Sequence, residues 1–222
     1  MVGRIANPSY NAGGALSTAM HYLFEHFGVA VSAVSGVLAA GGKRIDLFGV
    51  IVLALVTALG GGTLRDLVLG SSPVFWIQDP NYVATALVTA VVAFVIARRW
   101  AMPPKSLAIA DAFALAFFTI VGSAKGLSCQ AGNFNAVVLG VMTGVAGGIL
   151  RDVLVGEIPL VFRRETYLYA TASFFGATAF VSAEHWLPGN PTNRWMGTAV
   201  VLVLRLTAIQ WKWSLPVFRS KE

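Results

Sequence analysis

Charged residues are scarce in this sequence. Only 12% of its 222 residues are Asp, Glu, Lys or Arg, against roughly 25% in a soluble domain. Hydrophobic residues make up 56%, and the mean hydropathy is +0.72. Because so little polar surface cannot cover a globule in water, we expect an integral membrane protein.

Cysteine and histidine are scarcer still. The single cysteine, Cys129, excludes an intrachain disulfide and a cysteine-based metal cluster. The histidines His21, His26 and His185 lack the spacing of metal ligands, so no metal site is expected. The sequence also has no nucleophile–base set and no phosphate-binding loop, and an enzyme is not expected. The net charge of +6 falls in short loops rather than on one basic face, so no nucleic-acid partner is expected either.

Long apolar runs are what the sequence does contain. Seven of them have close to the ~20 residues that span about 30 Å of hydrocarbon as a helix. They lie near 21–41, 46–70, 81–99, 106–127, 133–156, 166–187 and 195–211. The predicted fold class is therefore an all-α integral membrane protein with seven transmembrane helices.

Lysine and arginine are unevenly divided between the two sides of these spans. Ten of the sixteen fall in loops 1–2, 3–4 and 5–6 and in the C-terminal tail, while two fall on the opposite side. By the positive-inside rule, the C-terminus is expected in the cytoplasm and the N-terminus outside. We expect a multi-pass protein of the cell membrane, the inner membrane where there are two.

The sequence repeats itself at an ungapped offset of 86 residues. A glycine-rich segment ending in Arg65-Asp66 returns as one ending in Arg151-Asp152. Other matched pairs are Glu25 with Asp111, Gly36 with Gly122, Thr57 with Thr143, and Pro73 with Pro159. Because the repeated unit contains three spans, an odd number, the second copy crosses the membrane in the opposite sense.

The predicted organisation is an inverted 3+3 repeat followed by a seventh helix. Residues 1–19 lack the apolar core of a signal peptide and are expected to be an extramembrane tail or a leader introduced by cloning. The remaining units are expected at 20–100 for the first repeat, 105–188 for the second, 194–212 for the seventh helix and 213–222 for a cytoplasmic tail.

Glycines interrupt the second and fifth spans at matched positions. They are Gly60, Gly61 and Gly62 in the second span and Gly144, Gly147 and Gly148 in the fifth. Since glycine has low helix propensity, both helices are expected to kink or unwind there and to line a pathway. The alternative is close helix packing through small residues.

The charges beside these glycines predict specific contacts. On a helix, Arg65 and Asp66 point about 100° apart, so neither is expected to be the main partner of the other. Matched depth below the outer surface predicts a contact or near-contact between Glu25 and Arg65. The inverted copy predicts the equivalent contact between Asp111 and Arg151, so that the two would stand at opposite mouths of one pathway. Snorkelling of the arginines to headgroups is the alternative.

Two more basic residues lie inside spans. Lys125, near the outer end of the fourth span, is expected to face a pore, to bind a lipid headgroup or to snorkel. Arg205, near the cytoplasmic end of the seventh span, is expected to snorkel. The carboxylates Glu25, Asp66, Asp111 and Asp152 outnumber the bases Arg65, Arg151 and Lys125, which favours weak cation selectivity.

The seven-span plan, the duplication and the paired Gly-Gly-x-x-Arg-Asp segments resemble a prokaryotic member of the trimeric intracellular cation (TRIC) channel family. They are also similar to bacterial membrane domains described as glycine transporters. The resemblance covers about residues 20–212. It implies a homotrimer among membrane lipids, with a pore in each subunit that is lined by kinked second and fifth helices. It also implies permeation by potassium and, less selectively, sodium. Lys125 matches one basic residue of a lipid-binding segment in eukaryotic members, but Cys129 stands where a second would be.

Three functions follow from these patterns. A potassium-permeable monovalent cation channel is expected, and a secondary transporter of a small amino acid such as glycine is the alternative. A membrane scaffold without transport is disfavoured by the charges inside the spans. No cofactor is expected apart from the permeant ion.

Overall fold

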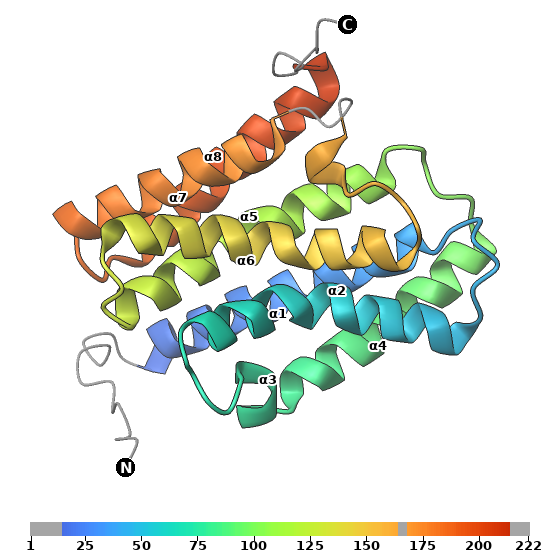
Figure 1. Cartoon of the computed structure of the whole chain (residues 1–222), viewed down its shortest axis with the longest axis horizontal. Helices are drawn as coiled ribbons and strands as arrows, with labels where there is room; N and C mark the ends of the chain where they lie inside the picture. The colour runs from blue at the N-terminus through green and yellow to red at the C-terminus, as the bar shows by residue number, and fades with distance from the viewer. Residues whose placement is uncertain (1–14, 164–167, 214–222) are drawn as a thin grey trace, which may run out of the picture.

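The computed structural model describes residues 15–163 and 168–213, without the side chains of residues 15–18. Within these ranges the chain forms a bundle of long helices that run roughly along one axis (Figure 1). The helices are α1 (Ala15–Ala39), α2 (Leu47–Val68), α3 (Phe75–Gln78), α4 (Asn81–Arg99), α5 (Ser106–Ser128), α6 (Asn133–Leu154), the 3-10 helix η1 (Leu160–Phe162), α7 (Tyr169–Trp186) and α8 (Pro191–Trp211). The predicted all-helical membrane fold is confirmed.

Seven of these helices are long, and they match the seven predicted runs. Five of them, α1, α2, α4, α5 and α6, are long and apolar enough to cross a membrane by length and composition. The other two carry more polar residues, since α7 has Glu184 and His185 in its last turn and α8 includes Arg194 and Arg205. The crossing of the membrane by all seven stays a prediction.

Two helices begin earlier than the units predicted from the sequence. Helix α1 begins at Ala15, inside the segment 1–19 expected to be an extramembrane tail, while residues 1–14 lie outside the described residues. The seventh helix begins at Pro191 rather than near 194, because Asn190 caps it: its side chain accepts a hydrogen bond of 3.0 Å from the N–H of Thr192. Proline is well suited to the first helical turn, where its missing N–H costs nothing. The tail from 214 onward lies outside the described residues. The division of the chain into units stays a prediction.

The two halves of the chain pack in the same way. In the first half α1 and α2 both contact α4, and in the second α5 and α6 both contact α7. Between the halves, α2 packs against α6 and α1 against α5, as the inverted repeat predicts. The remaining long helix, α8, packs against α5 and α7 of the second half (Figure 1).

Two equivalent glycines allow α2 and α6 to meet backbone to backbone. A Cβ atom on Gly61 would lie 2.3 Å from the carbonyl oxygen of Thr143. A Cβ atom on Gly147 would lie 2.4 Å from the carbonyl oxygen of Thr57. Both helices continue through their glycines without a break, so the expected unwinding is not found. Close packing is what these glycines provide, and a bend of either helix stays a prediction.

The same two threonines also organise the contacts inside each half. Gly36 of α1 faces the hydroxyl of Thr57, and Gly122 of α5 faces the hydroxyl of Thr143. Each hydroxyl donates to the carbonyl oxygen four residues earlier in its own helix, over 2.6 Å in both cases. A polar group at the closely packed crossing of the helices is therefore satisfied without water.

The α2–α6 contact predicts different costs for two adjacent glycines. Gly61→Ala should destabilise the protein by about 1–3 kcal/mol, because the new methyl group meets main-chain atoms that cannot move aside. Gly60→Ala is the matched control, since its methyl group would meet only the flexible end of Leu150. The midpoint of thermal unfolding in detergent should fall clearly for Gly61→Ala and little for Gly60→Ala. Equal midpoints for the two variants would contradict the backbone contact.

The orientation of the bundle can be tested at Cys129, which is exposed in the turn between α5 and α6. If the N-terminus is outside, a membrane-impermeant maleimide should label Cys129 in intact spheroplasts. The double variant Lys43→Cys, Cys129→Ser places the thiol in the α1–α2 turn and should be labelled only after the membrane is permeabilised. The reverse pattern would show that the predicted orientation is wrong.

Candidate functional site

Each repeat contains an arginine that bonds the aspartate directly after it. The Nε atom of Arg65 donates to Oδ1 of Asp66 over 2.8 Å, and Nε of Arg151 donates to Oδ1 of Asp152 over 2.8 Å. Neither neighbour is expected from the sequence to be the main partner of the other, yet the two are bonded directly in both repeats. Successive residues on a helix do point about 100° apart, but the long arginine side chain reaches back to the carboxylate.

The second oxygen of each aspartate holds the segment that follows its helix. Oδ2 of Asp66 accepts the N–H of Phe75 over 2.8 Å, and Oδ2 of Asp152 accepts the N–H of Leu160 over 2.7 Å. Both carboxylates are almost fully buried. With both oxygens occupied, these aspartates fix the α2–α3 and α6–η1 connections against the ends of their helices.

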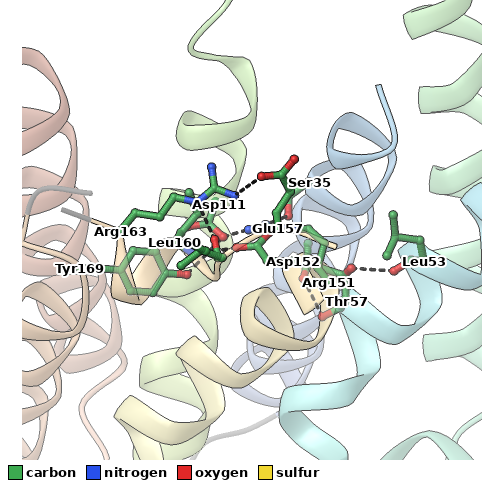
Figure 2. A network of polar contacts seen from close by, with 12 residues as sticks. Ser35, Leu53, Thr57, Asp111, Arg151, Asp152, Glu157, Leu160, Arg163 and Tyr169 are labelled. Carbon is green, nitrogen blue, oxygen red and sulfur yellow. Dashed lines mark hydrogen bonds and ion pairs between the residues drawn. The ribbon is translucent and has the colours of Figure 1, made fainter. Parts of the chain in front are cut away.

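Arg151 lies at the centre of a buried polar cluster contributed by several helices (Figure 2). Its Nη1 atom donates to Oδ1 of Asp111 over 2.8 Å and to the hydroxyl of Ser35 over 2.7 Å. The predicted contact between Asp111 and Arg151 is therefore confirmed. Arg151 is completely inaccessible and Asp111 is 3% exposed, so this arginine does not snorkel.

Two side chains from α7 and α8 complete this cluster. The hydroxyl of Tyr169 donates to Oδ1 of Asp111 over 3.2 Å. The guanidinium of Arg205 lies over the Tyr169 ring, 4.6 Å from its centroid, with Nη2 4.0 Å from Oδ2 of Asp111. The prediction that Arg205 snorkels is wrong: it is 1% exposed, because it faces a carboxylate inside the protein instead of the membrane surface. We call Asp111, Arg151, Asp152, Ser35, Tyr169 and Arg205 the Asp111 cluster.

The equivalent residues of the first repeat are arranged differently. Glu25 accepts a hydrogen bond from the hydroxyl of Tyr82, and Arg65 lies 5.4 Å from the centroid of the Phe75 ring. Among the described residues no hydrogen bond or ion pair joins Glu25 to Arg65, so a direct contact between them is not found, and the near-contact stays a prediction. The ring of Phe75 contacts both Arg65 and Tyr82, and α3, which carries it, is not predicted by the repeat. We call Glu25, Arg65, Asp66, Phe75 and Tyr82 the Glu25 cluster.

The two tyrosines are functional candidates that the repeat alignment missed. Tyr82 bonds Glu25 as Tyr169 bonds Asp111, although the ungapped offset of 86 places Tyr82 opposite Leu168. The second repeat therefore has one more residue between its Arg-Asp pair and its tyrosine. The tyrosine shortly before Ala-Thr-Ala in both halves was the available signal.

Two further equivalent glycines make room for these clusters. A Cβ atom on Gly62 would lie 2.5 Å from the Phe75 ring. A Cβ atom on Gly148 would lie 3.0 Å from the hydroxyl of Tyr169 and 3.2 Å from Oδ1 of Asp111. Gly144 instead packs against Thr119. Of the predicted pore glycines, two therefore shape the charged sites directly.

Lys125 is not part of either cluster. It lies in the last turn of α5, whereas Asp111 lies near the first. Lys125 is half-buried, and its side chain forms no hydrogen bond or ion pair with the rest of the described chain. The other charged residues of the predicted pore set are thus divided between the two clusters, and Lys125 belongs to neither.

One ion-pair group lies in the loops beside the Asp111 cluster. Glu157 pairs with Lys43, and Nη2 of Arg163 lies 3.3 Å from the same carboxylate. The hydrogen bond from Lys43 holds the pKa of Glu157 below its usual range. Its contribution to folding is therefore present at neutral pH and is lost as the pH falls through that lowered pKa. Because these side chains are solvated, the contribution is small.

The burial of Asp111 predicts a large effect of its removal. Asp111→Asn removes the negative charge that lies 2.8 Å from Arg151 and 4.0 Å from Arg205. Breaking a buried pair in this way typically costs about 3–5 kcal/mol. Glu157→Gln is the control, because it removes a carboxylate from a solvated pair. Thermal unfolding in detergent should show a large loss for Asp111→Asn and almost none for Glu157→Gln, and similar losses would contradict this assignment.

Both a family profile and individual bacterial membrane proteins match this sequence over most of its length. The profile of the family described as "Glycine transporter" matches residues 22–98 and 108–185, one segment within each repeat. The UPF0126 membrane protein of Vibrio cholerae is 46% identical over 209 residues, with 92% of this chain and 85% of that protein covered. The UPF0126 inner membrane protein YadS of Escherichia coli K12 is 44% identical, with 90% and 97% covered.

Solved structures share the fold over nearly their whole length. The TRIC trimeric intracellular cation channel orthologue from Rhodobacter sphaeroides has a TM-score of 0.81 and 38% identity, with 87% of this chain and 99% of that chain covered. A second TRIC cation channel has a TM-score of 0.80 and 32% identity, with 90% and 98% covered.

Proposed function

The chain belongs to the glycine transporter family of membrane proteins and has the fold of the TRIC channels, and we propose that it is a monovalent cation channel. The observation that carries the proposal is the likeness to named cation channels, which extends over almost the whole of their chains. Potassium is the proposed permeant ion, and we propose that sodium also permeates, less selectively.

The proposed pathway runs through each subunit along α2 and α6, between the Glu25 and Asp111 clusters. These helices cross where Gly61 meets Thr143 and Gly147 meets Thr57, and their Arg-Asp pairs lie beyond the crossing in opposite directions. Buried ionisable residues in membrane proteins typically face such routes. Because backbone atoms touch at the crossing, ions would pass only when α2 and α6 move apart there.

The proposed setting is the inner membrane, with the N-terminus outside and the C-terminus in the cytoplasm. A relative is named an inner membrane protein, and a structural neighbour is named trimeric, so we propose a homotrimer surrounded by lipid. Lys125 lies in the last turn of α5 with no polar partner in the described chain, which suits contact with an anionic lipid headgroup.

A transporter of a small amino acid such as glycine is the second candidate. The name of the matched family and the inverted repeat favour it. A transporter would bind its solute in a saturable site and alternate between two conformations. A channel would instead pass many ions during each opening, and this difference separates the candidates.

Two measurements on one purified preparation test the proposal. In planar bilayers with a potassium gradient, we expect unitary currents that reverse near the potassium equilibrium potential. In liposomes, labelled glycine should enter no faster than into protein-free vesicles. Saturable glycine uptake without unitary currents would overturn the channel and support the transporter. Currents that reverse near the chloride potential would overturn cation selectivity.

A further inference from the structure

An imidazole lies against the tyrosine of the Glu25 cluster. The ring of His26 stacks on the ring of Tyr82, with their centroids 4.4 Å apart and their planes inclined by 5°. Because the hydroxyl of Tyr82 donates to Glu25, a single side chain separates this imidazole from the carboxylate. At the other end of the bundle, the guanidinium of Arg205 lies over the ring of Tyr169. Both tyrosines therefore pack against a basic group, but only the imidazole changes its charge near neutral pH.

His26 is bonded at one of its two ring nitrogens. Its Nδ1 atom lies 2.7 Å from the hydroxyl of Thr85 on α4. Its Nε2 atom is buried and has no hydrogen-bond partner in the described part of the chain. A neutral imidazole has one N–H donor, whereas a protonated imidazole has two. Protonation therefore gives His26 a second donor and a positive charge.

Two carboxylates from different elements act on this ring. Glu25 precedes His26 on α1, Asp79 lies between α3 and α4, and both attract a positive charge on the imidazole. Asp79 accepts a hydrogen bond of 2.9 Å from Tyr22, whose ring centroid lies 4.2 Å from that of His26. Tyr22 is exposed, so the site lies close to the solution at this end. A proton on His26 thus offsets the negative charge of both carboxylates.

The other charged side chains at the Glu25 end are lysine, arginine, aspartate and glutamate. They are Arg65 and Asp66 on α2, Lys125 on α5, Glu184 on α7 and Arg194 on α8. Residues of these types ordinarily titrate outside the range from about pH 5.5 to about pH 7.5, so they form a constant background there. The three histidines of the sequence all lie at this end, since His21 precedes His26 on α1 and His185 is in the last turn of α7.

We propose that His26 is a proton-binding site at the Glu25 end of the pathway, and that the charge of the bound proton reduces the entry of cations there. The proposal rests on the proposed cation-channel function. A positive charge added beside Glu25 lowers the local concentration of cations, whatever the net charge of that end was before. The Tyr82 ring stabilises the added charge through a cation–π contact. The duplication gives the other end no such site, because the residue that matches His26 is Ala112.

The test is the unitary potassium current in excised spheroplast patches while one face is acidified from about pH 7.5 to about pH 5.5, the range in which histidine titrates. Labelling of Cys129 identifies the face, because Cys129 lies at the same end as Glu25. At about 0.1 M KCl, the current entering at the Glu25 end should fall about two- to threefold, the effect of one unit charge several ångströms from the path in a water-like dielectric. Acid at the opposite face should change nothing, since it has no histidine.

Substitutions of the histidine separate its charge from its packing. His26→Gln keeps a group that can bond Thr85, and His26→Phe keeps a ring against Tyr82. In both variants the ratio of the currents at the higher and lower pH should be close to one. His26→Lys should carry the reduced current at both pH values, because its charge is permanent there. His185→Gln is the matched control, since it removes a histidine that packs on Trp186, and it should keep the wild-type ratio.

Salt concentration separates the charge of the proton from a movement of the helices. At about 1 M KCl the Debye length is about 3 Å, against about 10 Å at 0.1 M, so the reduction by acid should become smaller. A reduction of equal size at both salt concentrations would mean that protonation closes the pathway by rearranging it. That result would overturn the proposed electrostatic effect.

The remaining outcomes separate this inference from the function on which it rests. A wild type without cation currents would overturn both. Cation currents that do not respond to acid at the Glu25 end would overturn the inference alone, as would a response that persists in His26→Gln and in His26→Phe. Loss of the response in His21→Gln, with the response kept in His26→Gln, would assign the proton to His21 and would also overturn it.

Discussion

The contact between the backbones of α2 and α6 is the constraint on which the rest of the structure depends. A Cβ atom at Gly61 or at Gly147 would collide with a carbonyl oxygen of the facing helix, so no residue other than glycine permits the two helices to approach so closely. This approach places each Arg-Asp pair beyond the crossing, one toward each end of the bundle. It also brings the threonines at positions 57 and 143 into the centre, where their hydroxyls are satisfied within their own helices.

Beyond that crossing, the two ends of the bundle contain equivalent residues whose contacts differ. In both, an arginine bonds the following aspartate, that aspartate holds the next segment, and a tyrosine bonds the carboxylate from the first helix of the repeat. Only at the Asp111 end does the arginine also reach this carboxylate. The difference follows from the segment after α2, where Phe75 lies against Arg65 and Tyr82.

The sequence predicts correctly the features that depend on hydrophobic periodicity and on the repeat. It does not predict the contacts that depend on how far a long side chain reaches or on a segment that only one repeat contains. The helices, the duplication and the Asp111–Arg151 pair follow from apolar run length and matched depth. The bond between Arg65 and Asp66 was missed because helical angles describe Cβ directions rather than the end of a flexible side chain. Glu25 and Arg65 do not bond directly because the unpredicted helix α3 brings Phe75 against Arg65 and Tyr82. Arg205 was misjudged because its partner belongs to a helix distant in sequence.

The crossing of α2 and α6 also has a consequence for the origin of the chain. Gly61 meets Thr143 and Gly147 meets Thr57, so the surface is self-complementary, as in an isologous dimer interface. A single three-helix unit with such a surface could have assembled with an oppositely inserted copy of itself before the two genes fused. In the present chain the first half carries Lys43, Arg44, Arg98 and Arg99 in the loops that we predict to be cytoplasmic, and such a bias favours a single orientation of that half.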